Sequence, residues 1–456
     1  MQTDVDVLVI GAGACGLAAA IAAHDAGASV AIVEKRDRPG GNSSLSTGSV
    51  PAAGSRFQRE AGIVDSPDTL VRDLMAIAGE TDDANLVRRM ADVSAETVEW
   101  LVDTVGARLK LVTAYKHIGH SVPRLHAPVS RRGQDLVDDL LAAVAKREIP
   151  LAVGNAVQDL IVEDGAVMGA VIDTGQDHSE IRAHKVILSV NGFAGNPDLV
   201  KRFCPEIAGA QYFGALGSTG EAVIWGEKLG ADLANMAAYQ GYAAVAYPQG
   251  SLLSWTTIEK GGLLVGPDGR RFGNESLGYS GYARIVLGQG QEAFALFDQR
   301  IFDIAAQEEE FVELWKYGGV KKADTPEQAA ALLGIDSQAL AEEVAAYNAA
   351  AGGSGADRFG RRDFGHAPLQ APFYIGRVVP GLFHTQGGLR VDGDGRVLRP
   401  DSSAIANLFA GGGAAAGISG RAGALGYASG NGLLTAIALG RLAALAAARE
   451  IAGAAA

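Results

Sequence analysis

The chain has 456 residues, is 48% hydrophobic and carries a net charge of −13. This length predicts more than one domain, and the acidic charge argues against a nucleic-acid partner. The two cysteines, Cys15 and Cys204, are too few for a disulfide framework, a zinc site, an iron–sulfur cluster or a haem-attachment motif. We therefore expect no metal centre, and we expect any redox group to be organic.

The apolar stretch Val7–Ala23 has the length of a signal peptide, but Asp4 and Asp6 precede it where a signal would carry Lys or Arg. No other apolar run is expected to reach the roughly 20 residues that cross a membrane. The sequence thus predicts no transmembrane segment and a cytoplasmic protein.

The first elements form a β–turn–α–β unit. Asp4–Ile10 is predicted to be a buried strand, Gly16–Ala26 a helix and Ser29–Glu34 a second strand, which is typical of a parallel sheet. Gly40–Gly54 is rich in Gly, Ser and Asn and is predicted to be an extended loop over a ligand.

The next part of the chain is predicted to alternate helices and short strands. One or two helices are expected over 65–105, and further helices over 133–146 and 219–229. Short strands are expected at 151–157, 160–162, 167–173 and 185–190, with Glu163-Asp164-Gly165 joining the middle pair as a hairpin.

Tyr and Trp become frequent from about residue 235, and a charged helical stretch covers 298–316. A strand-like segment at 375–379, a Gly-rich segment and a long Ala-rich helix from about Asn431 follow. We predict an α/β fold in which residues 1–234 and 366–456 build a Rossmann-like domain and 235–365 form an inserted α+β capping domain for the substrate.

The turn Gly11-Ala-Gly13-Ala-Cys-Gly16 follows a strand and opens a helix. Gly11 permits the tight turn, Gly13 lets a pyrophosphate approach the backbone, and Gly16 allows close packing of helix and strand. The helix N-terminus attracts the anion, and Glu34 at the end of the next strand can accept hydrogen bonds from ribose hydroxyls. The spacing predicts a dinucleotide site, although an ordinary Gly-rich turn remains the alternative.

Five further motifs carry a resemblance to a known family. They are Pro39-Gly40-Gly41-Asn42-Ser43, Gly269-Arg270-Arg271-Phe272-Gly273-Asn274-Glu275, Thr385-Gln386-Gly387-Gly388-Leu389, Leu408-Phe409-Ala410-Gly411-Gly412-Gly413 and Gly430-Asn431-Gly432-Leu433-Leu434. Together with the Gly11 turn they resemble the flavoprotein family of fumarate reductase, succinate dehydrogenase and 3-ketosteroid dehydrogenase, with the 3-ketosteroid dehydrogenases nearest in site pattern. The matches are collinear over nearly the whole chain.

The resemblance implies an FAD-binding domain with the capping domain closing over the flavin. It implies noncovalent FAD, because Leu45–Gly48 lacks the His that links the flavin in some members. The sequence departs from the family at Gly413, where a Glu is common. The implied FAD contacts are Gly11, Gly13, Ala14, Cys15, Gly16, Glu34, Lys35, Gly41, Asn42, Ser43, Ser46, Gly48, Val157, Asn191, Gly192, Gly220, Glu221, Gly412, Gly413, Asn431, Leu433 and Leu434.

The substrate positions depart from the fumarate reductases. Where those enzymes have a proton-donating Arg, a carboxylate-binding His and a carboxylate-binding Arg, this chain has Tyr279, Phe383 and Tyr427. Their upstream Glu and Arg correspond to Trp255 and Ile258. A dicarboxylate requires fixed positive charge, so these replacements argue against fumarate and succinate.

The 3-ketosteroid dehydrogenases also have a Tyr at the position of Tyr279. The resemblance implies Tyr279 as the base that takes the α proton of a ketone, and Tyr427 with the Gly426 amide as donors to its carbonyl oxygen. The two Tyr roles are interchangeable at this stage. Tyr279 packing in the cap and Tyr427 in the core are the alternatives.

Four other residues are candidates for the substrate site. Phe383 is predicted to be a pocket wall, whereas His384 should point the other way on an alternating strand. Arg421 is expected either to hold a substrate carboxylate or to pair within the protein. Arg124, with His117, His120 and His126, belongs to a polar segment over the pocket, which we interpret as a solvated loop rather than a metal site.

The leading hypothesis is an FAD-dependent oxidoreductase that desaturates a cyclic ketone or oxo acid, such as a 3-ketosteroid or 4-oxocyclohexanecarboxylate. The alternatives are a reductase of an enone or enoate, an oxidase, a polycarboxylate dehydrogenase of the tricarballylate type that uses Arg421 and Arg124, and a non-enzymatic flavin-binding or assembly protein. The expected partners are a small-molecule substrate and a separate electron donor or acceptor.

Overall fold

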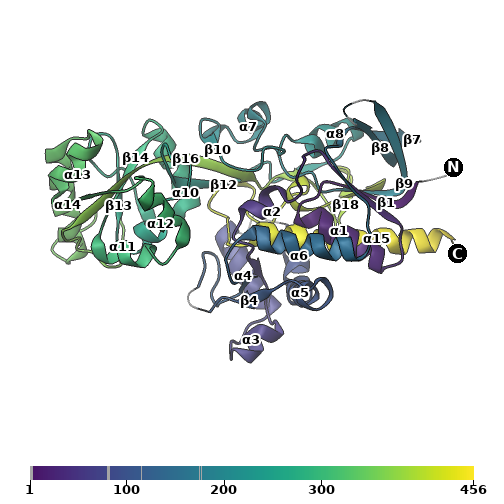
Figure 1. Ribbon diagram of the computed structural model, residues 1–456, viewed down its shortest axis with the longest axis horizontal. Helices are drawn as coiled ribbons and strands as arrows, with labels where there is room; N and C mark the ends of the chain where they lie inside the picture. The colour runs from purple at the N-terminus through teal and green to yellow at the C-terminus, as the bar shows by residue number, and fades with distance from the viewer. Residues whose placement is uncertain (1–3, 80–82, 114–115, 174, 176, 456) are drawn as a thin grey trace. The chain divides into compact units, whose positions relative to one another are not determined.

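Figure 1 shows the computed structural model, which describes residues 4–79, 83–113, 116–173, 175 and 177–455. The chain divides into two compact units. The first comprises Met1–Cys204, Gly214–Tyr239 and His384–Ala456, and the second comprises Pro205–Phe213 and Gln240–Phe383. The second unit ends at Phe383 rather than at the predicted residue 365, because strand β16 (Phe373–Thr385) pairs with β14 (Ala293–Asp298) over residues 373–378.

The sheet of the first unit has the strand order β18-β19-β9-β1-β2-β6. Strand β1 (Val5–Ile10) pairs in parallel with both β2 (Val30–Glu34) and β9 (His178–Leu188), and α1 (Ala14–Asp25) connects β1 to β2. This confirms the predicted β–turn–α–β unit and the α/β class. The remaining strands are β6 (Leu151–Val153), β18 (Arg396–Leu398) and β19 (Ala404–Ala410).

The predicted hairpin is confirmed as β7 (Ala156–Glu163) and β8 (Ala166–Asp173), with Glu163 paired to Ala166. Asp164 and Gly165 have φ angles of 51° and 78°, the left-handed pair that a two-residue turn between twisted strands requires. Strand β6 covers only residues 151–153 of the strand predicted at 151–157. The strand predicted at 160–162 is not separate, because β7 runs without a break through a register shift between Val157 and Asp159.

The segment predicted as a loop over residues 40–54 contains a short helix, α2 (Gly41–Leu45), and strand β3 (Val50–Pro51). Strand β3 joins a small sheet with β4 (Leu109–Leu111) and β5 (Leu125–Pro128). The other elements of the first unit are α3 (Arg56–Glu60), α4 (Pro67–Ala78), α5 (Ala84–Trp100) with a wider helical turn at Leu101–Val105, α6 (Gly133–Lys146), α7 (Pro197–Phe203), α8 (Glu221–Leu229), β11 (Leu233–Ala234), β17 (Gly388–Leu389) and β20 (Ala422–Gly423).

Helix α15 (Asn431–Ala455) lies beside α1, which also packs against α6 (Figure 1). Small residues allow the close approach: a Cβ added at Gly440 would lie 2.4 Å from the backbone oxygen of Cys15. By length and composition, Asn431–Ala454 could cross a membrane, contrary to the expectation that no such run follows the N-terminal strand. However, 83% of its apolar window is buried within the protein, as in a core helix.

The second unit is built on a sheet in which β13 (Leu263–Val265), β14, β16 and β12 (Ala237–Ala246) are neighbours. The predicted helical stretch 298–316 begins at the end of β14 and forms two helices, α11 (Gln299–Ala305) and α12 (Glu309–Lys316). Their aromatic side chains pack on the sheet: the ring of Phe302 stacks on Tyr374 with centroids 4.4 Å apart. The other elements are β10 (Gln211–Tyr212), α9 (Thr256–Glu259), α10 (Gly278–Gly288), β15 (Lys321–Ala323), α13 (Pro326–Leu333) and α14 (Ser337–Ala351).

Replacing Gly440 with Ala should destabilise the first unit, because the added methyl group meets backbone atoms of Cys15 that cannot move independently of α1. The expected loss is about 1–3 kcal/mol, measured as a lower thermal unfolding midpoint by circular dichroism. Gly453 lies in the same helix, and a Cβ there meets no atom within 4 Å. Gly453→Ala is therefore the control, and equal stability of both variants would contradict the packing argument.

Candidate functional site

The turn between β1 and α1 leaves backbone N–H donors free at the N-terminus of α1. A Cβ added at Gly16 would lie 1.9 Å from the Gly11 oxygen, so only glycine permits this approach. Gly13 caps α1 without a side-chain hydrogen bond. Among the described residues the N–H groups of Cys15 and Gly16 find no acceptor, and this end of the helix can therefore bind an anion.

Glu34 lies at the carboxyl end of β2, where its carboxylate is held by the backbone. One oxygen accepts from the Ala12 N–H and the other from the Arg36 N–H, both at 2.8 Å. Each oxygen keeps a further lone pair that can accept from a ribose hydroxyl. The predicted role of Glu34 is thus supported by its orientation beside the Gly11 turn.

Three side-chain hydrogen bonds connect the segment over residues 214–221 to this end of the sheet. The Asn42 side-chain oxygen accepts from the Ala215 N–H at 2.7 Å, and the Asn191 amide donates to Ser218 Oγ at 2.7 Å. Lys35 Nζ donates to Glu221 at 2.5 Å. Asn42, Asn191, Lys35 and Glu221, which lie far apart in sequence, are thereby brought together.

Several buried polar atoms at these positions have no partner among the described residues. They are Asn42 Nδ2, Glu221 Oε2 and Asn431 Oδ1. Burying a polar atom without a hydrogen-bond partner costs free energy. A bound dinucleotide would supply partners for these three atoms. The residues present therefore fit FAD: the N-terminus of α1 would hold the pyrophosphate, and Glu34 would accept from the ribose hydroxyls.

The remaining predicted contacts are distributed along the same unit. Gly41, Ser43 and Ser46 lie in or just after α2, and Ser43 Oγ accepts from the Ala14 N–H at 3.2 Å. Gly48 packs on Pro128, and Val157 lies in β7. Gly192 lies in the loop after β9, Gly220 and Gly412 lie where short helices begin, and Leu433 and Leu434 lie in the first turn of α15.

Gly413 departs from the family for a physical reason. A Cβ there would lie 2.5 Å from Asn191 Oδ1 and 2.7 Å from the Gly192 nitrogen. A larger side chain at this position would displace Asn191, which itself has a left-handed φ of 66°.

The thiol of Cys15 is buried in packing contacts. A Cβ added at Gly411 would lie 2.7 Å from its sulfur, and burial raises the pKa of Cys15 to about 12. The thiol is therefore protonated at neutral pH and packs beside Gly411, just after β19, whereas the backbone N–H of Cys15 lies at the N-terminus of α1.

In the first unit, the candidate substrate residues surround the start of α15. Gly426 is buried, a Cβ there would lie 2.3 Å from the Ser419 oxygen, and its N–H finds no acceptor among the described residues. Tyr427 follows it and is half-buried. Arg421 is exposed and forms no ion pair or hydrogen bond with a described residue.

His384 lies closer to this region than the sequence suggested. Its ring faces Gly432, where an added Cβ would lie 3.7 Å from the Cε1 atom of His384. Burial lowers the pKa of His384, so the imidazole is neutral at pH 7.

In the second unit, Tyr279 belongs to an aromatic cluster. The ring of Tyr242 stands 5.1 Å from that of Tyr279 and stacks on Phe383 at 5.5 Å, with Trp255 6.5 Å away. The Trp255 indole N–H is buried and has no partner among the described residues. The sequence therefore placed three of the cluster's residues in the site, and it missed Tyr242, which is common to all three contacts.

A buried ion cluster fixes the start of α10, which carries Tyr279. Arg271 donates to Glu275 at 2.6 and 2.9 Å and to Asp357, and Arg361 lies 3.5 Å from Glu275. Arg271 also lies over the ring of Tyr347, 4.9 Å from its centroid. The predicted cap motif therefore has a structural role, which is to hold the turn that precedes Tyr279.

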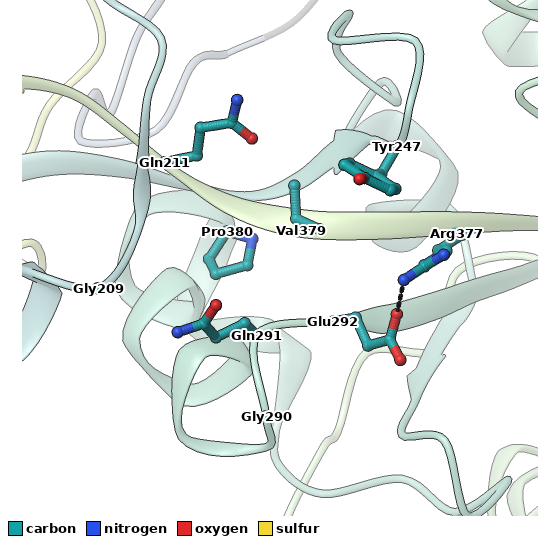
Figure 2. Close-up of a pocket in the computed structure, with 9 residues that line it drawn as sticks. All are labelled: Gly209, Gln211, Tyr247, Gly290, Gln291, Glu292, Arg377, Val379 and Pro380. Carbon is teal, nitrogen blue, oxygen red and sulfur yellow. Dashed lines mark ion pairs between the residues drawn. The ribbon is translucent and has the colours of Figure 1, made fainter.

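The second unit also contains an open pocket of about 390 Å³, shown in Figure 2. Arg377 lies on one side of it, paired with Glu292 and 4.8 Å from the ring centroid of Tyr247. Gln211, Gln291, Val379 and Pro380 complete the lining with two glycines. None of the predicted substrate residues lines this pocket.

The comparisons with known proteins agree with this geometry. The FAD binding domain family matches residues 6–433. The solved open conformation of a flavocytochrome c3 fumarate reductase is 30% identical, with a TM-score of 0.85 over 98% of this chain and 78% of that one.

The chain belongs to this FAD-binding family. Its cofactor is FAD, and the family's members are oxidoreductases that act on CH–CH bonds or on C=C bonds.

Two other relatives define the range of the family. The 3-ketosteroid-Δ4-(5α)-dehydrogenase from Rhodococcus jostii RHA1 is 26% identical, with a TM-score of 0.77 over 98% of both chains. The NADH:fumarate oxidoreductase of Klebsiella pneumoniae strain 342 is 30% identical over 91% of this chain, but the chain spans only 45% of that longer protein.

Arg124 has a different role from the one predicted. Its side chain is fully buried and donates to Asp65 at 2.7 and 2.8 Å and to Asp73. Both carboxylates occupy the guanidinium, so it is a structural residue in the first unit rather than a carboxylate-binding one.

The His-rich segment is also buried rather than a solvated loop. His120 Nδ1 accepts from Arg124 at 3.4 Å, and its Nε2–H donates to the Ser429 oxygen at 2.8 Å. His126 Nε2 lies 2.9 Å from Ser55 Oγ. Burial lowers the pKa of each of these two histidines to about 4, so both are neutral at pH 7. His120 connects the segment to the residue before the C-terminal motif, whereas His126 connects it to the start of α3.

Replacing Glu34 with Gln should weaken FAD binding, because one of the two backbone N–H groups that it now accepts would face an amide N–H₂. The loss of a charge-assisted hydrogen bond predicts a Kd for FAD raised about tenfold or more in titrations of the apoprotein. Asp37 is exposed in the same loop, so Asp37→Asn is the matched control. An unchanged Kd for Glu34→Gln would remove Glu34 from the site.

Proposed function

We propose that the protein is an FAD-dependent dehydrogenase that forms a C=C bond beside the carbonyl of a cyclic ketone or oxo acid. The buried Gly426 N–H without an acceptor carries this proposal, since it is a donor suited to a carbonyl oxygen. The phenols and apolar groups at Tyr279, Phe383 and Tyr427 support a ketone over a dicarboxylate.

The proposed reaction removes one proton from the α carbon and one hydride from the β carbon. FAD, when bound, accepts the hydride. Tyr279 takes the α proton, and the electron pair of that C–H bond passes to the forming double bond through the enolate. The Gly426 N–H and the Tyr427 hydroxyl donate to the carbonyl oxygen, where negative charge develops.

The aromatic cluster favours Tyr279 over its neighbours as the base. The Tyr242 hydroxyl donates to the Leu253 oxygen at 3.1 Å and accepts from the backbone N–H of Trp255 at 3.0 Å. Burial raises the pKa of both Tyr242 and Tyr282 well above the ordinary value, which keeps these two phenols protonated. Tyr279 is half-buried, so its phenol is more exposed than these two.

A second candidate, a polycarboxylate dehydrogenase, is favoured by one observation. Arg421 is an exposed cation with no partner among the described residues, and it follows the family's flavin motif closely in sequence. The same residues also serve the reverse reaction, reduction of an enone, whose direction depends on the electron partner. We propose a separate carrier as that partner.

The proposal predicts which compounds reduce the flavin under anaerobic conditions. The holoenzyme is mixed with a 3-ketosteroid, 4-oxocyclohexanecarboxylate, succinate and tricarballylate, and loss of the oxidised-flavin absorbance is followed. A ketone should bleach the flavin and succinate should not. Tyr279→Phe should slow the bleaching by about 10²–10⁴-fold, the usual loss on removing a general base.

Tyr317 is 77% exposed in the same unit, and Tyr317→Phe is the control that should keep the rate of the unaltered enzyme. Bleaching by succinate or tricarballylate alone would contradict the ketone proposal and favour Arg421 as a carboxylate-binding residue. An unchanged rate in Tyr279→Phe would exclude it as the base.

A further inference from the structure

Arg131 is a half-buried cation in the first unit for which the family motifs provide no role. Its Nη2 lies 3.4 Å from His117 Nε2, and its Nη1 is buried without a partner among the described residues. No described carboxylate lies within ion-pair distance of it, whereas nearby Arg124 is paired with two. In a protein of net charge −13, such a guanidinium is suited to an external anion.

The backbone of Arg131 is also unusual. It has a φ of 58°, in the left-handed region that costs a residue with a Cβ roughly 1–2 kcal/mol. Gly or Asn would adopt this conformation more easily. Strain of this kind persists where the position of a side chain has a use, so the outlier points to a function for the guanidinium.

The position of Arg131 is defined by its two neighbouring segments. Its own turn packs against the Ser46–Gly48 loop. The Arg131 N–H donates to the Pro128 oxygen, the Pro128 ring packs on Gly48, and the Gly133 N–H donates to the Ser46 oxygen at 2.6 Å. The Ser46–Gly48 loop is one of the predicted FAD contacts.

The segment that carries His117 packs under the C-terminal motif. The Ser429 N–H donates to the Ile118 oxygen at 2.9 Å, and Gly119 packs directly on Ala428, the residue after Tyr427. The contact between Arg131 and His117 therefore joins the segment under the flavin loop to the segment under Gly426 and Tyr427.

We infer that Arg131, oriented by His117, binds a carboxylate of the substrate, so that the substrate is a cyclic oxo acid rather than a neutral ketone. This inference rests on the proposed dehydrogenase reaction and adds the substrate class. The Arg131 guanidinium donates to the carboxylate, while the Gly426 N–H donates to the ketone oxygen of the same molecule. His117 accepts from Arg131 and fixes the plane of the guanidinium.

The charge of this pair matches one carboxylate. Burial, together with the nearby charge of Arg131, lowers the pKa of His117 to about 4. His117 is therefore neutral at pH 7 and adds no second positive charge. A single fixed cation suits a monocarboxylate and leaves a second carboxylate of a fumarate-like substrate without a partner here.

The test compares 4-oxocyclohexanecarboxylate with its methyl ester, which has the same ring and ketone but no charge. In the holoenzyme, Arg131→Asn should lower kcat/KM for the acid by about 10–100-fold, the loss of a hydrogen bond to a charged group, and leave the ester within about twofold. Asn accepts the left-handed backbone, and its thermal midpoint should not fall, which separates loss of binding from misfolding.

Arg132 provides the matched control. It is the next residue, it is exposed, and it lies 3.7 Å from Asp135, so Arg132→Asn should change neither substrate. Equal losses for acid and ester in Arg131→Asn, or no loss for the acid, would overturn the inference.

A binding measurement separates this inference from the proposed reaction. Cyclohexanecarboxylate lacks the ketone and cannot react, so its Kd for the holoenzyme reports the anion site alone. Binding of it that weakens about tenfold or more in Arg131→Asn supports the site even where no ketone bleaches the flavin. Reaction of ketones without any dependence on Arg131 would leave the dehydrogenase proposal standing and overturn the carboxylate site.

Discussion

The close approach of α1 to its surroundings is the constraint on which the first unit depends. Gly11 and Gly16 bring the start of the helix against the strand ends, and Gly411 and Gly440 bring the end of β19 and α15 against Cys15. A methyl group at any of these positions would meet backbone or sulfur atoms within 3 Å. The helix N-terminus, which we predict to hold the pyrophosphate, is thus positioned by the absence of side chains at these glycines, and α15 takes part in the same packing.

In each unit, a cluster of buried ion pairs lies next to the segment that carries a candidate catalytic Tyr. In the first, Asp65 and Asp73 neutralise Arg124, which contacts His120, and His120 reaches the backbone beside Tyr427. In the second, Glu275 and Asp357 neutralise Arg271 before Tyr279. Buried ion pairs are a poor source of stability, because desolvation offsets their attraction. Their value here is geometric, since each fixes the turn that presents a phenol.

Short sequence motifs predicted the features of the fold that depend on neighbouring residues alone. The glycine turn, Glu34, the Asp164-Gly165 hairpin and the start of α15 follow from backbone requirements that short motifs express. Partners distant in sequence could not be predicted in this way. Asp65 and Asp73 lie more than 50 residues before Arg124, so nothing near Arg124 indicated that its charge was already neutralised. The burial of His120 and the left-handed backbone of Arg131 are likewise consequences of tertiary packing.

Cations near the substrate are likewise not fully predicted by the residues at aligned positions. Tyr279, Phe383 and Tyr427 replace charged residues of the fumarate reductases, and comparison position by position finds no positive charge in the site. A cation need not lie at an aligned position to reach the same substrate. Arg131 comes from the turn before α6, outside the family motifs, and contacts the segment that carries His117. The proposed role of Arg131 would place charge recognition on another element while the flavin site stays fixed, which is why unpaired buried donors matter for the substrate class as well as aligned residues.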